Sequence, residues 1–298
     1  MKSKVRVAYH SGSWYSDDPS SLSKELSGYL STAKKLENSQ SLKSIIVPHA
    51  GYRFCGPTAA KSFININPSN FNRVVILGPS HHEYFEACGL TPYEYFETPF
   101  GNVKIDTDTV NNLLTKKKLF FSLPQTTDVK EHSIEMEMPF LKYIFDKKEF
   151  SLLPIMVGHN DLLTNTEIGK TLYDLYEDPK TLFVISSDFC HWGQRFGFTY
   201  YNEDYDDIWE STQDLDKQAL NIISEMNSSK LDQYFKKTKN TICGRNPITI
   251  VLSIIESYRK KHADKKVSFD TVGYDQSNKV KSMYDSSVSY AAGVNFVA

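Results

Sequence analysis

The sequence predicts one α/β domain in which helices flank a mixed central sheet. Several short apolar runs end in turn residues, and longer stretches with helical spacing lie between them, as is typical of an α/β sheet. A length of 298 residues with 40% hydrophobic residues is enough for a full core. The sequence has no Pro/Gly/Ser-rich linker, internal repeat or low-complexity tract, so we expect residues 1–298 to form a single domain.

The expected elements follow from this alternation. Strands are predicted at Lys43–Val47, Arg73–Leu77, Ser151–Val157, Thr181–Ser186 and Ser287–Val297. Helices are predicted near Ser20–Glu37, Pro57–Ile64, Thr107–Lys117, Ser133–Phe145, Thr164–Tyr176, Tyr205–Met226 and Pro247–Lys260. The polar segments Asn202–Asp214 and His262–Lys266 are expected to be helix ends or loops.

Charge and apolar patterning exclude several classes of protein. Lys and Arg total 34 against 36 Asp and Glu, so there is no broad basic field and nucleic acid is not expected as a main partner. No apolar run approaches the ~18 residues that span a bilayer, so we expect no membrane insertion. The four cysteines show no disulfide pattern and are expected to be reduced thiols, in a protein of the cytoplasm with the nucleus as a further location.

Four histidines follow apolar runs within a few residues. The segments SIIVPHAGY, RVVILGPSHH, LLPIMVGHN and LFVISSDFCHW contain His49, His81, His159 and His191, and His82 adjoins His81. Ligands of open α/β sheets bind beyond the carboxyl ends of the strands, so these imidazoles are expected at one edge. A single histidine after a strand is usually a turn residue, but the repetition and the neighbouring Pro and Gly residues favour a metal site.

Cys243 is a candidate metal-binding or oxidisable thiol. It lies in NTICGRNPITIVL, where Asn246 can cap and Pro247 can open the following helix. The positive end of a helix lowers the pKa of a thiol and favours the thiolate. The alternative is a buried, inert cysteine packed behind the cap.

Carboxylates near the histidines are candidates for proton transfer or for orienting an imidazole. Asp188 lies three residues before His191, and His132 follows a glutamate in KEHSIEMEMPF. We select Asp188, His191 and His132 as candidate catalytic or supporting residues. Three further carboxylates of that segment rank below Asp188 and His132, because the alternative is that they are solvated charges at a helix start: Glu131, Glu135 and Glu137.

Motifs along the whole chain resemble those of the Memo family. They are HSGSWY, VPHAGYRFCG, ILGPSHH, EHSIEMEMPF, PIMVG, VISSDFCHWGQRF, NTICGRNPI and DSSVSYAAG. The sequence is similar to a fungal or other eukaryotic member of that family. The resemblance implies a fold like that of the class III extradiol (LigB-type) non-haem iron dioxygenases, with a vestigial metal site.

The resemblance also implies a ligand set and a functional context. The metal ligands would be His49 from PHAGY, His81 from GPSHH and Cys243 from TICGR, with Asp188 and His191 lining the same cleft. The family is linked to iron and copper, to redox control and, in animals, to receptor-driven cell motility through phosphotyrosine peptides. Animal members tend to carry a histidine in place of Asn246, so this chain is not expected to share any role of that histidine.

Three functions therefore compete. The first is an iron-binding or copper-binding protein, with zinc as a further alternative, that acts in redox or metal homeostasis and in motility or invasive-growth signalling. The second is an active oxidoreductase, which is disfavoured because a dioxygenase normally uses two histidines and one carboxylate where Cys243 stands here. The third is a metal-independent adaptor for a phosphotyrosine peptide of a signalling protein. Its groove would be formed by Trp14, Tyr15, Tyr52, Arg53, Trp192 and Arg195.

Overall fold

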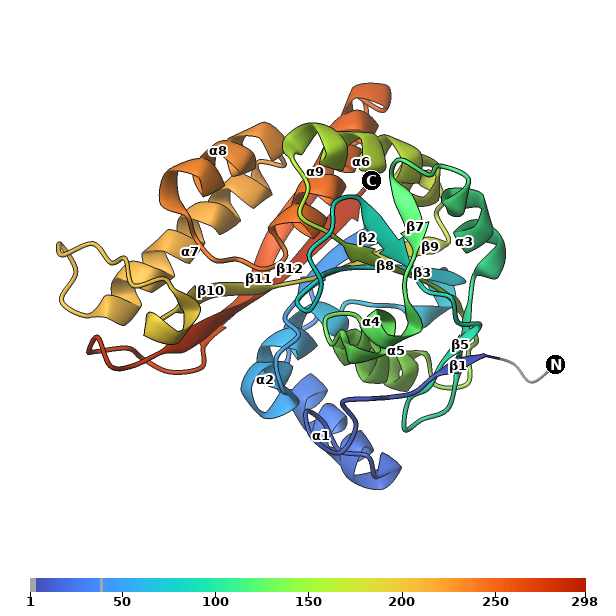
Figure 1. Cartoon of the computed structure of the whole chain (residues 1–298), viewed down its shortest axis with the longest axis horizontal. Helices are drawn as coiled ribbons and strands as arrows, with labels where there is room; N and C mark the ends of the chain where they lie inside the picture. Colours follow the sequence, from blue (N-terminus) through green and yellow to red (C-terminus); the bar gives the residue numbers. More distant parts are fainter. Residues whose placement is uncertain (1–3, 38–39) are drawn as a thin grey trace.

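A mixed β-sheet runs through the molecule and positions the other elements (Figure 1). The computed structural model describes residues 4–37 and 40–298, and all strands in these ranges join one 12-stranded sheet. The strands are β1 Val5–Arg6, β2 Ser41–Val47, β3 Arg73–Pro79, β4 Cys88–Leu90, β5 Tyr95–Phe96, β6 Val103–Ile105, β7 Phe120–Ser122, β8 Ser151–Val157, β9 Thr181–Ser186, β10 Asp188–Trp192, β11 Val267–Gln276 and β12 Ser287–Val297. Their main order is β1-β5-β6-β8-β3-β9-β2-β12-β10, with β11 beside β12, β4 beside β8 and β7 beside β4.

The centre of the sheet is parallel, which brings the carboxyl ends of its strands to one edge. Strands β8, β3, β9 and β2 run in the same direction, whereas β12 runs opposite to them and pairs antiparallel with both β2 and β10. In this register Val47 of β2 lies beside Ser186 of β9, and Leu77 of β3 lies beside Ile185. The residues that follow β2, β3 and β9 therefore emerge next to one another.

Helices cover both faces of the sheet. Figure 1 shows α6, α8 and α9 on one side, and α1, α2 and α5 on the other. The helices are α1 Pro19–Thr32, α2 Tyr52–Phe63, α3 Thr107–Leu114, α4 Gln125–Lys130, α5 Met138–Phe145, α6 Leu162–Glu177, α7 Ile208–Ser224, α8 Ser228–Thr238 and α9 Arg245–Lys261. Short 3-10 turns occupy Pro68–Asn70, Glu135–Glu137 and Gln194–Phe196.

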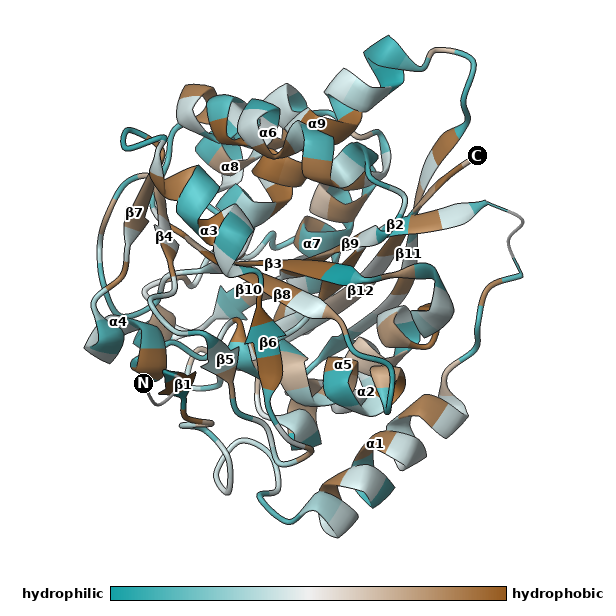
Figure 2. Cartoon of the chain, turned by 90° about the vertical axis from the view of Figure 1, so that its right-hand side faces the viewer, coloured by the Kyte–Doolittle hydropathy of each residue, from teal (hydrophilic) through white to brown (hydrophobic). Residues whose placement is uncertain are grey.

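The core lies between the helix layers and the central strands. Figure 2 shows the apolar residues concentrated along these strands. In β3 the consecutive residues Val74, Val75, Ile76 and Leu77 have no exposed surface. Such an unbroken apolar run is typical of a parallel strand that is covered on both faces.

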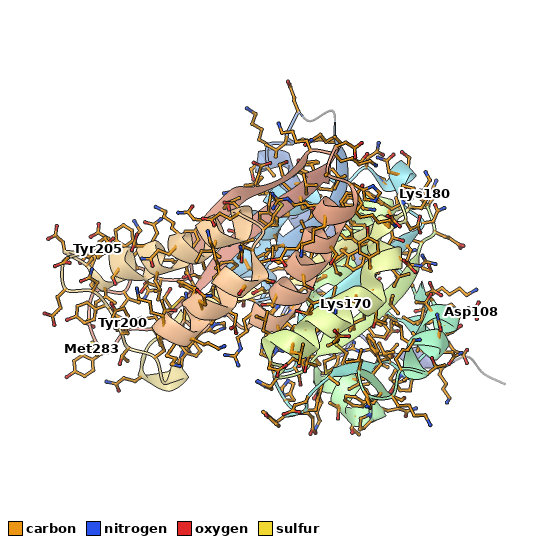
Figure 3. The ribbon with its side chains drawn as sticks, turned by 90° about the horizontal axis from the view of Figure 1, so that it is seen from above. Asp108, Lys170, Lys180, Tyr200, Tyr205 and Met283 are labelled. Atoms are coloured by element: carbon orange, nitrogen blue, oxygen red, sulfur yellow. The ribbon has the colours of Figure 1, made fainter. Side chains whose placement is uncertain are left out.

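An extension at one end of the molecule is more exposed. Figure 3 places Tyr200, Tyr205 and Met283 at its far end, where the segment between β10 and α7 meets the turn between β11 and β12. Lys170 and Lys180 lie over the opposite part of the molecule. Among the described residues, no helix combines the length and the apolar character needed to cross a membrane.

The α/β fold with a mixed, helix-flanked sheet is confirmed, and all five predicted strands are present. Several helix bounds differ from the prediction. Helix α2 begins at Tyr52 rather than at Pro57, which lies inside it, and α5 begins only at Met138, after a 3-10 turn. Strand β11 and helix α8 were not predicted, because both are rich in polar residues and only partly buried.

Candidate metal centre

Three imidazoles meet at the carboxyl edge of the sheet. His49 lies two residues beyond β2, His81 lies two residues beyond β3, and His132 lies between α4 and the 3-10 turn before α5. One ring nitrogen from each of the three lies within 4.8 Å of the others. The three side chains are therefore close enough to bind one metal ion. His49 is buried, whereas 26% of the His81 side chain is exposed.

Cys243 reaches the same place from the opposite half of the chain. Its Sγ lies 3.2 Å from Nε2 of His49 and accepts a hydrogen bond from the backbone N–H of Asp188 at 3.2 Å. The next residue, Gly244, packs against Ser187 so closely that an added Cβ would lie 2.3 Å from the Ser187 Cβ. Only glycine allows this approach, which holds the thiol beside the end of β9.

Three imidazoles at the site are engaged through Nδ1 with a neighbouring group. His49 Nδ1 lies 2.6 Å from Ser186 Oγ, His81 Nδ1 lies 2.9 Å from Glu131 Oε1, and His191 Nδ1 lies 3.2 Å from the Thr241 carbonyl. An imidazole that donates from Nδ1 presents the lone pair of Nε2. The outer contacts therefore favour the tautomer in which Nε2 can bind an ion.

The contacts of Ser186 show how this tautomer is set at His49. The Ser186 hydroxyl donates to the Ser133 carbonyl at 2.6 Å, and a carbonyl can only accept. Ser186 Oγ must then accept its other two hydrogen bonds. One comes from Nδ1 of His49, and the other comes from Glu137 Oε1 at 2.8 Å. Burial raises the pKa of Glu137 well above its usual value, so this carboxyl carries the proton that it donates.

Burial keeps most of these histidines neutral, as a metal ligand must be. It lowers the pKa of His49 well below its usual range, that of His132 to about 3 and that of His191 to about 4. His81 differs. Burial alone would lower its pKa, but contacts with Cys243 and Glu131 raise it to about 10. The His81 ring is therefore the protonated one in the metal-free protein.

The predicted lowering of the Cys243 pKa is wrong for the metal-free protein. Burial raises the pKa of this thiol, and the contact with His81 opposes the effect only in part. Helix α9 also begins earlier than expected, at Arg245 after Gly244, so Asn246 does not cap it. Asn246 is buried, and its amide bridges the Gly158 carbonyl and the Asn165 side chain.

Asp188 lies beside the clustered histidines as expected, but its carboxyl binds a backbone N–H rather than an imidazole. Its Oδ1 accepts the backbone N–H of His49 at 2.9 Å, and this contact fixes the start of the loop that carries the histidine. Burial raises the pKa of Asp188 to about 7. Near neutral pH this carboxyl is therefore balanced between its two protonation states.

The alternative that the glutamates in EHSIEMEMPF are solvated charges is wrong. Glu131, Glu135 and Glu137 have exposed fractions of only 1–2%. Each makes specific hydrogen bonds: Glu131 accepts from His81, Glu135 accepts from Arg6 and Tyr15, and the protonated Glu137 bonds to Ser186. The polar pattern that suggested a solvated helix start reflects a buried polar network instead.

A large cavity opens next to the cluster. Its volume is about 1020 Å³, and its wall includes His49, His81, His132, Asp188 and His191. Four residues of the predicted peptide groove also line it: Trp14, Tyr15, Arg53 and Arg195. The prediction is wrong for Tyr52 and Trp192, which are buried in the core and donate to the backbone carbonyls of Met136 and Tyr200.

Two histidines of the predicted set lie outside the cluster. The His159 ring stacks on Tyr84 with a centroid distance of 4.9 Å, and it does not line the cavity. His82 is exposed and lies 6.1 Å from the His132 ring. Conversely, His132 was predicted only in a catalytic or supporting role. Its position beside His49 and His81, where it could bind the same metal ion, was not predicted. Its segment follows no predicted strand, so the strand-end argument did not apply to it.

The fold and the site define an α/β protein with a cluster of imidazoles and one thiol at the carboxyl edge of its sheet. Residues 6–294 match the family described as Memo-like protein. The chain belongs to the Memo family, as its motifs indicated.

Known relatives share nearly the full length of the chain. Protein MEMO1 of Danio rerio is 42% identical over 98% of this chain and 97% of its own length, and Protein MEMO1 of Homo sapiens is 39% identical over 97% and 96%. The crystal structure of an uncharacterised protein from Escherichia coli K12 covers 86% of this chain and 99% of its own, with a TM-score of 0.51 and 10% identity. That likeness concerns the fold alone.

Proposed function

We propose that this protein binds one redox-active metal ion, iron before copper, with zinc as a further alternative. His49, His81 and Cys243 are the ligands, and His132 is a further donor within reach. The observation that carries the proposal is the 3.2 Å contact between Cys243 Sγ and His49 Nε2, beside two more imidazoles. Ligands that bind one metal ion lie a few ångströms apart, because metal–ligand bonds are only ~2.0–2.3 Å long.

The chemistry of these donors supports the choice of metals. Imidazole suits iron, copper and zinc, and a thiolate adds a soft ligand that favours Cu(I), zinc or iron. Three engaged Nδ1 atoms support a preorganised site, since outer hydrogen bonds fix ligand orientation in metal centres. The adjoining cavity leaves space for water or for another ligand at the ion.

The biological role that we propose is redox or metal homeostasis linked to cell motility or invasive-growth signalling. An oxidisable thiolate at a metal centre supports a redox role. All four cysteines are free thiols, which supports action in the cytoplasm, and also in the nucleus.

Metal content and thermal stability test this function. Protein purified without a metal-binding tag should contain about one equivalent of iron or copper, and Fe²⁺ added anaerobically to metal-free protein should raise the melting temperature by mass action. Cys243→Ser and His49→Ala should each remove this rise, whereas Cys88→Ser, in β4, should keep it. Full metal affinity in Cys243→Ser would exclude the thiolate as a ligand.

A phosphotyrosine-binding adaptor is the second candidate, because two arginines on the cavity wall form no ion pair with a carboxylate of the described residues. Arg53 lies over the Phe54 ring and Arg195 over the Phe196 ring, and within the described ranges neither forms an ion pair. Arginine is the residue that binds phosphate groups bidentately. A fluorescent phosphotyrosine peptide should bind in a polarisation assay and lose affinity in Arg53→Ala and Arg195→Ala. Equal binding of the unphosphorylated peptide would contradict this function.

A further inference from the structure

Glu131 contacts two of the three clustered imidazoles with a single carboxylate oxygen. Its Oε1 lies 2.9 Å from Nδ1 of His81 and 3.4 Å from Nδ1 of His132. The carboxylate is 2% exposed, so solvent does not compete for these contacts. One buried side chain therefore contacts both rings through their Nδ1 atoms.

The backbone holds the carboxylate in a fixed orientation. Oε1 accepts the backbone N–H groups of His132 and Ser133, both at 2.9 Å, and Oε2 accepts that of His81 at 2.7 Å. Every neighbour of the two oxygens is a donor. An ionised carboxylate, which only accepts, is the side chain that satisfies them all.

The charge of Glu131 has no lysine or arginine partner within the described ranges; its ion-pair contacts are the two imidazoles. Other buried carboxylates of the same segment do have such a partner, since Asp128 and Glu135 both pair with Arg6. A buried charge is stable only when it is paired or lies near a cation. At Glu131 that cation is either a protonated imidazole or a metal ion bound on the far side of the rings.

We propose that Glu131 is the positioning residue of the metal centre. It holds the Nδ1–H of His81 and His132 so that both rings present Nε2, and its negative charge offsets that of the bound ion. This inference rests on the proposed metal-binding function and adds a residue that does not touch the ion. Removing an outer-shell partner of this kind typically weakens metal binding about 10–100-fold.

Titration with Co²⁺, monitored by its visible absorption, tests the inference. In Glu131→Gln an amide NH₂ must face at least one N–H donor, so we expect about 10–100-fold weaker binding and an altered spectrum. Asp128→Asn is the matched control, because it changes a buried carboxylate of the same segment that pairs with Arg6. It should keep the affinity and the spectrum of the unmodified protein. Glu131→Asp, which retains the charge but cannot reach both rings, should resemble Glu131→Gln and replaces it if the amide variant does not fold.

A second readout needs no metal. In ¹⁵N NMR spectra of the metal-free protein, Nδ1 of the neutral His132 ring should stay protonated, and the Glu131 variants should show mixed His132 tautomers. Co²⁺ affinity and tautomers that remain unchanged in the Glu131 variants would overturn this inference alone. If the unmodified protein binds no Co²⁺, the metal-binding function itself fails.

Discussion

The indole of Trp14 lies against the imidazole of His132, with ring centroids 4.6 Å apart. The contact joins the N-terminal segment to the cluster of His49, His81 and His132. Glu135 anchors that segment by accepting the backbone N–H of His10 at 2.7 Å and the Tyr15 hydroxyl at 3.0 Å. Trp14 therefore packs against the cluster although its segment is distant from His132 in the sequence.

Metal binding should therefore change tryptophan fluorescence through Trp14. A paramagnetic ion such as Cu²⁺ or Co²⁺ at the cluster should quench the indole that packs on His132. Trp14→Phe should remove most of the quenching, whereas Trp209→Phe, at the start of α7, should preserve it. Quenching of equal depth in both variants would show that the ion binds elsewhere.

Metal affinity should increase with pH across the neutral range. His81 is protonated in the metal-free protein because its pKa is raised to about 10, and an ion must displace that proton. The Cys243 thiol, whose pKa is also raised, must lose its proton too, so the apparent affinity should rise by more than tenfold and up to about a hundredfold per pH unit below both pKa values. Zn²⁺ titrations at pH 6.5, 7.5 and 8.5 measure this slope, and an affinity independent of pH would contradict the protonated His81.

Acid should destabilise the metal-free protein before its exposed carboxylates titrate. The folded-state pKa of His132 is depressed to about 3, so its contribution to stability is present above the unfolded value near ~6.5 and is lost progressively as pH falls toward 3. Asp188, whose pKa is raised, acts in the opposite direction. In urea unfolding between pH 6.5 and 5, His132→Asn should reduce the pH slope by up to about 1.4 kcal/mol per unit.

Removing the Arg6 side chain should destabilise the folded protein, because Arg6 pairs with the buried carboxylates of Asp128 and Glu135. Arg6 pairs with Glu135 at 2.7 Å and also donates to backbone carbonyls of α4 and of the residue after it, Glu131. Arg6→Ala leaves buried carboxylates unpaired and should lower the free energy of unfolding by about 3–5 kcal/mol. Lys170→Ala, which breaks an exposed pair with Glu167, should cost at most ~1 kcal/mol in the same urea experiment.

Ring-cleaving dioxygenase turnover should be absent. The third expected ligand is the Cys243 thiol rather than the carboxylate that such iron enzymes use with two histidines. Protein loaded with Fe²⁺ under anaerobic conditions and then exposed to catechol and oxygen should form no ring-opened product. Robust oxygen consumption with ring opening, lost in His49→Ala, would overturn this expectation.

The central sheet was predictable because its strands are continuous apolar runs that end in turn residues. The same signal located His49 and His81, which follow β2 and β3 directly. The short strands at the sheet margins carry only two or three residues each, too few for a periodic pattern. Strand β11 alternates weakly because only one of its residues is fully buried.

The site was harder to predict where a residue depends on contacts that are distant in sequence. His132 joins the cluster because its segment packs beside the loops that follow β2 and β3. No pattern in the sequence around His132 predicts this contact. Glu131 resembles an exposed helix-start charge until its donors are known. Tyr52 and Trp192 occur in the same motifs as the histidines, yet they point into the core.

The order of the strands sets the order in which the site can be completed during synthesis. The candidate ligands span residues 49–243, and β10, which carries Asp188 and His191, pairs with β12, the strand nearest the C-terminus. A nascent chain that has not yet reached Ser287 lacks the strand that joins β10 to β2. The positions of Asp188 and His191 beside the candidate ligands are therefore fixed only after β12 has been synthesised and has paired with β10 and β2.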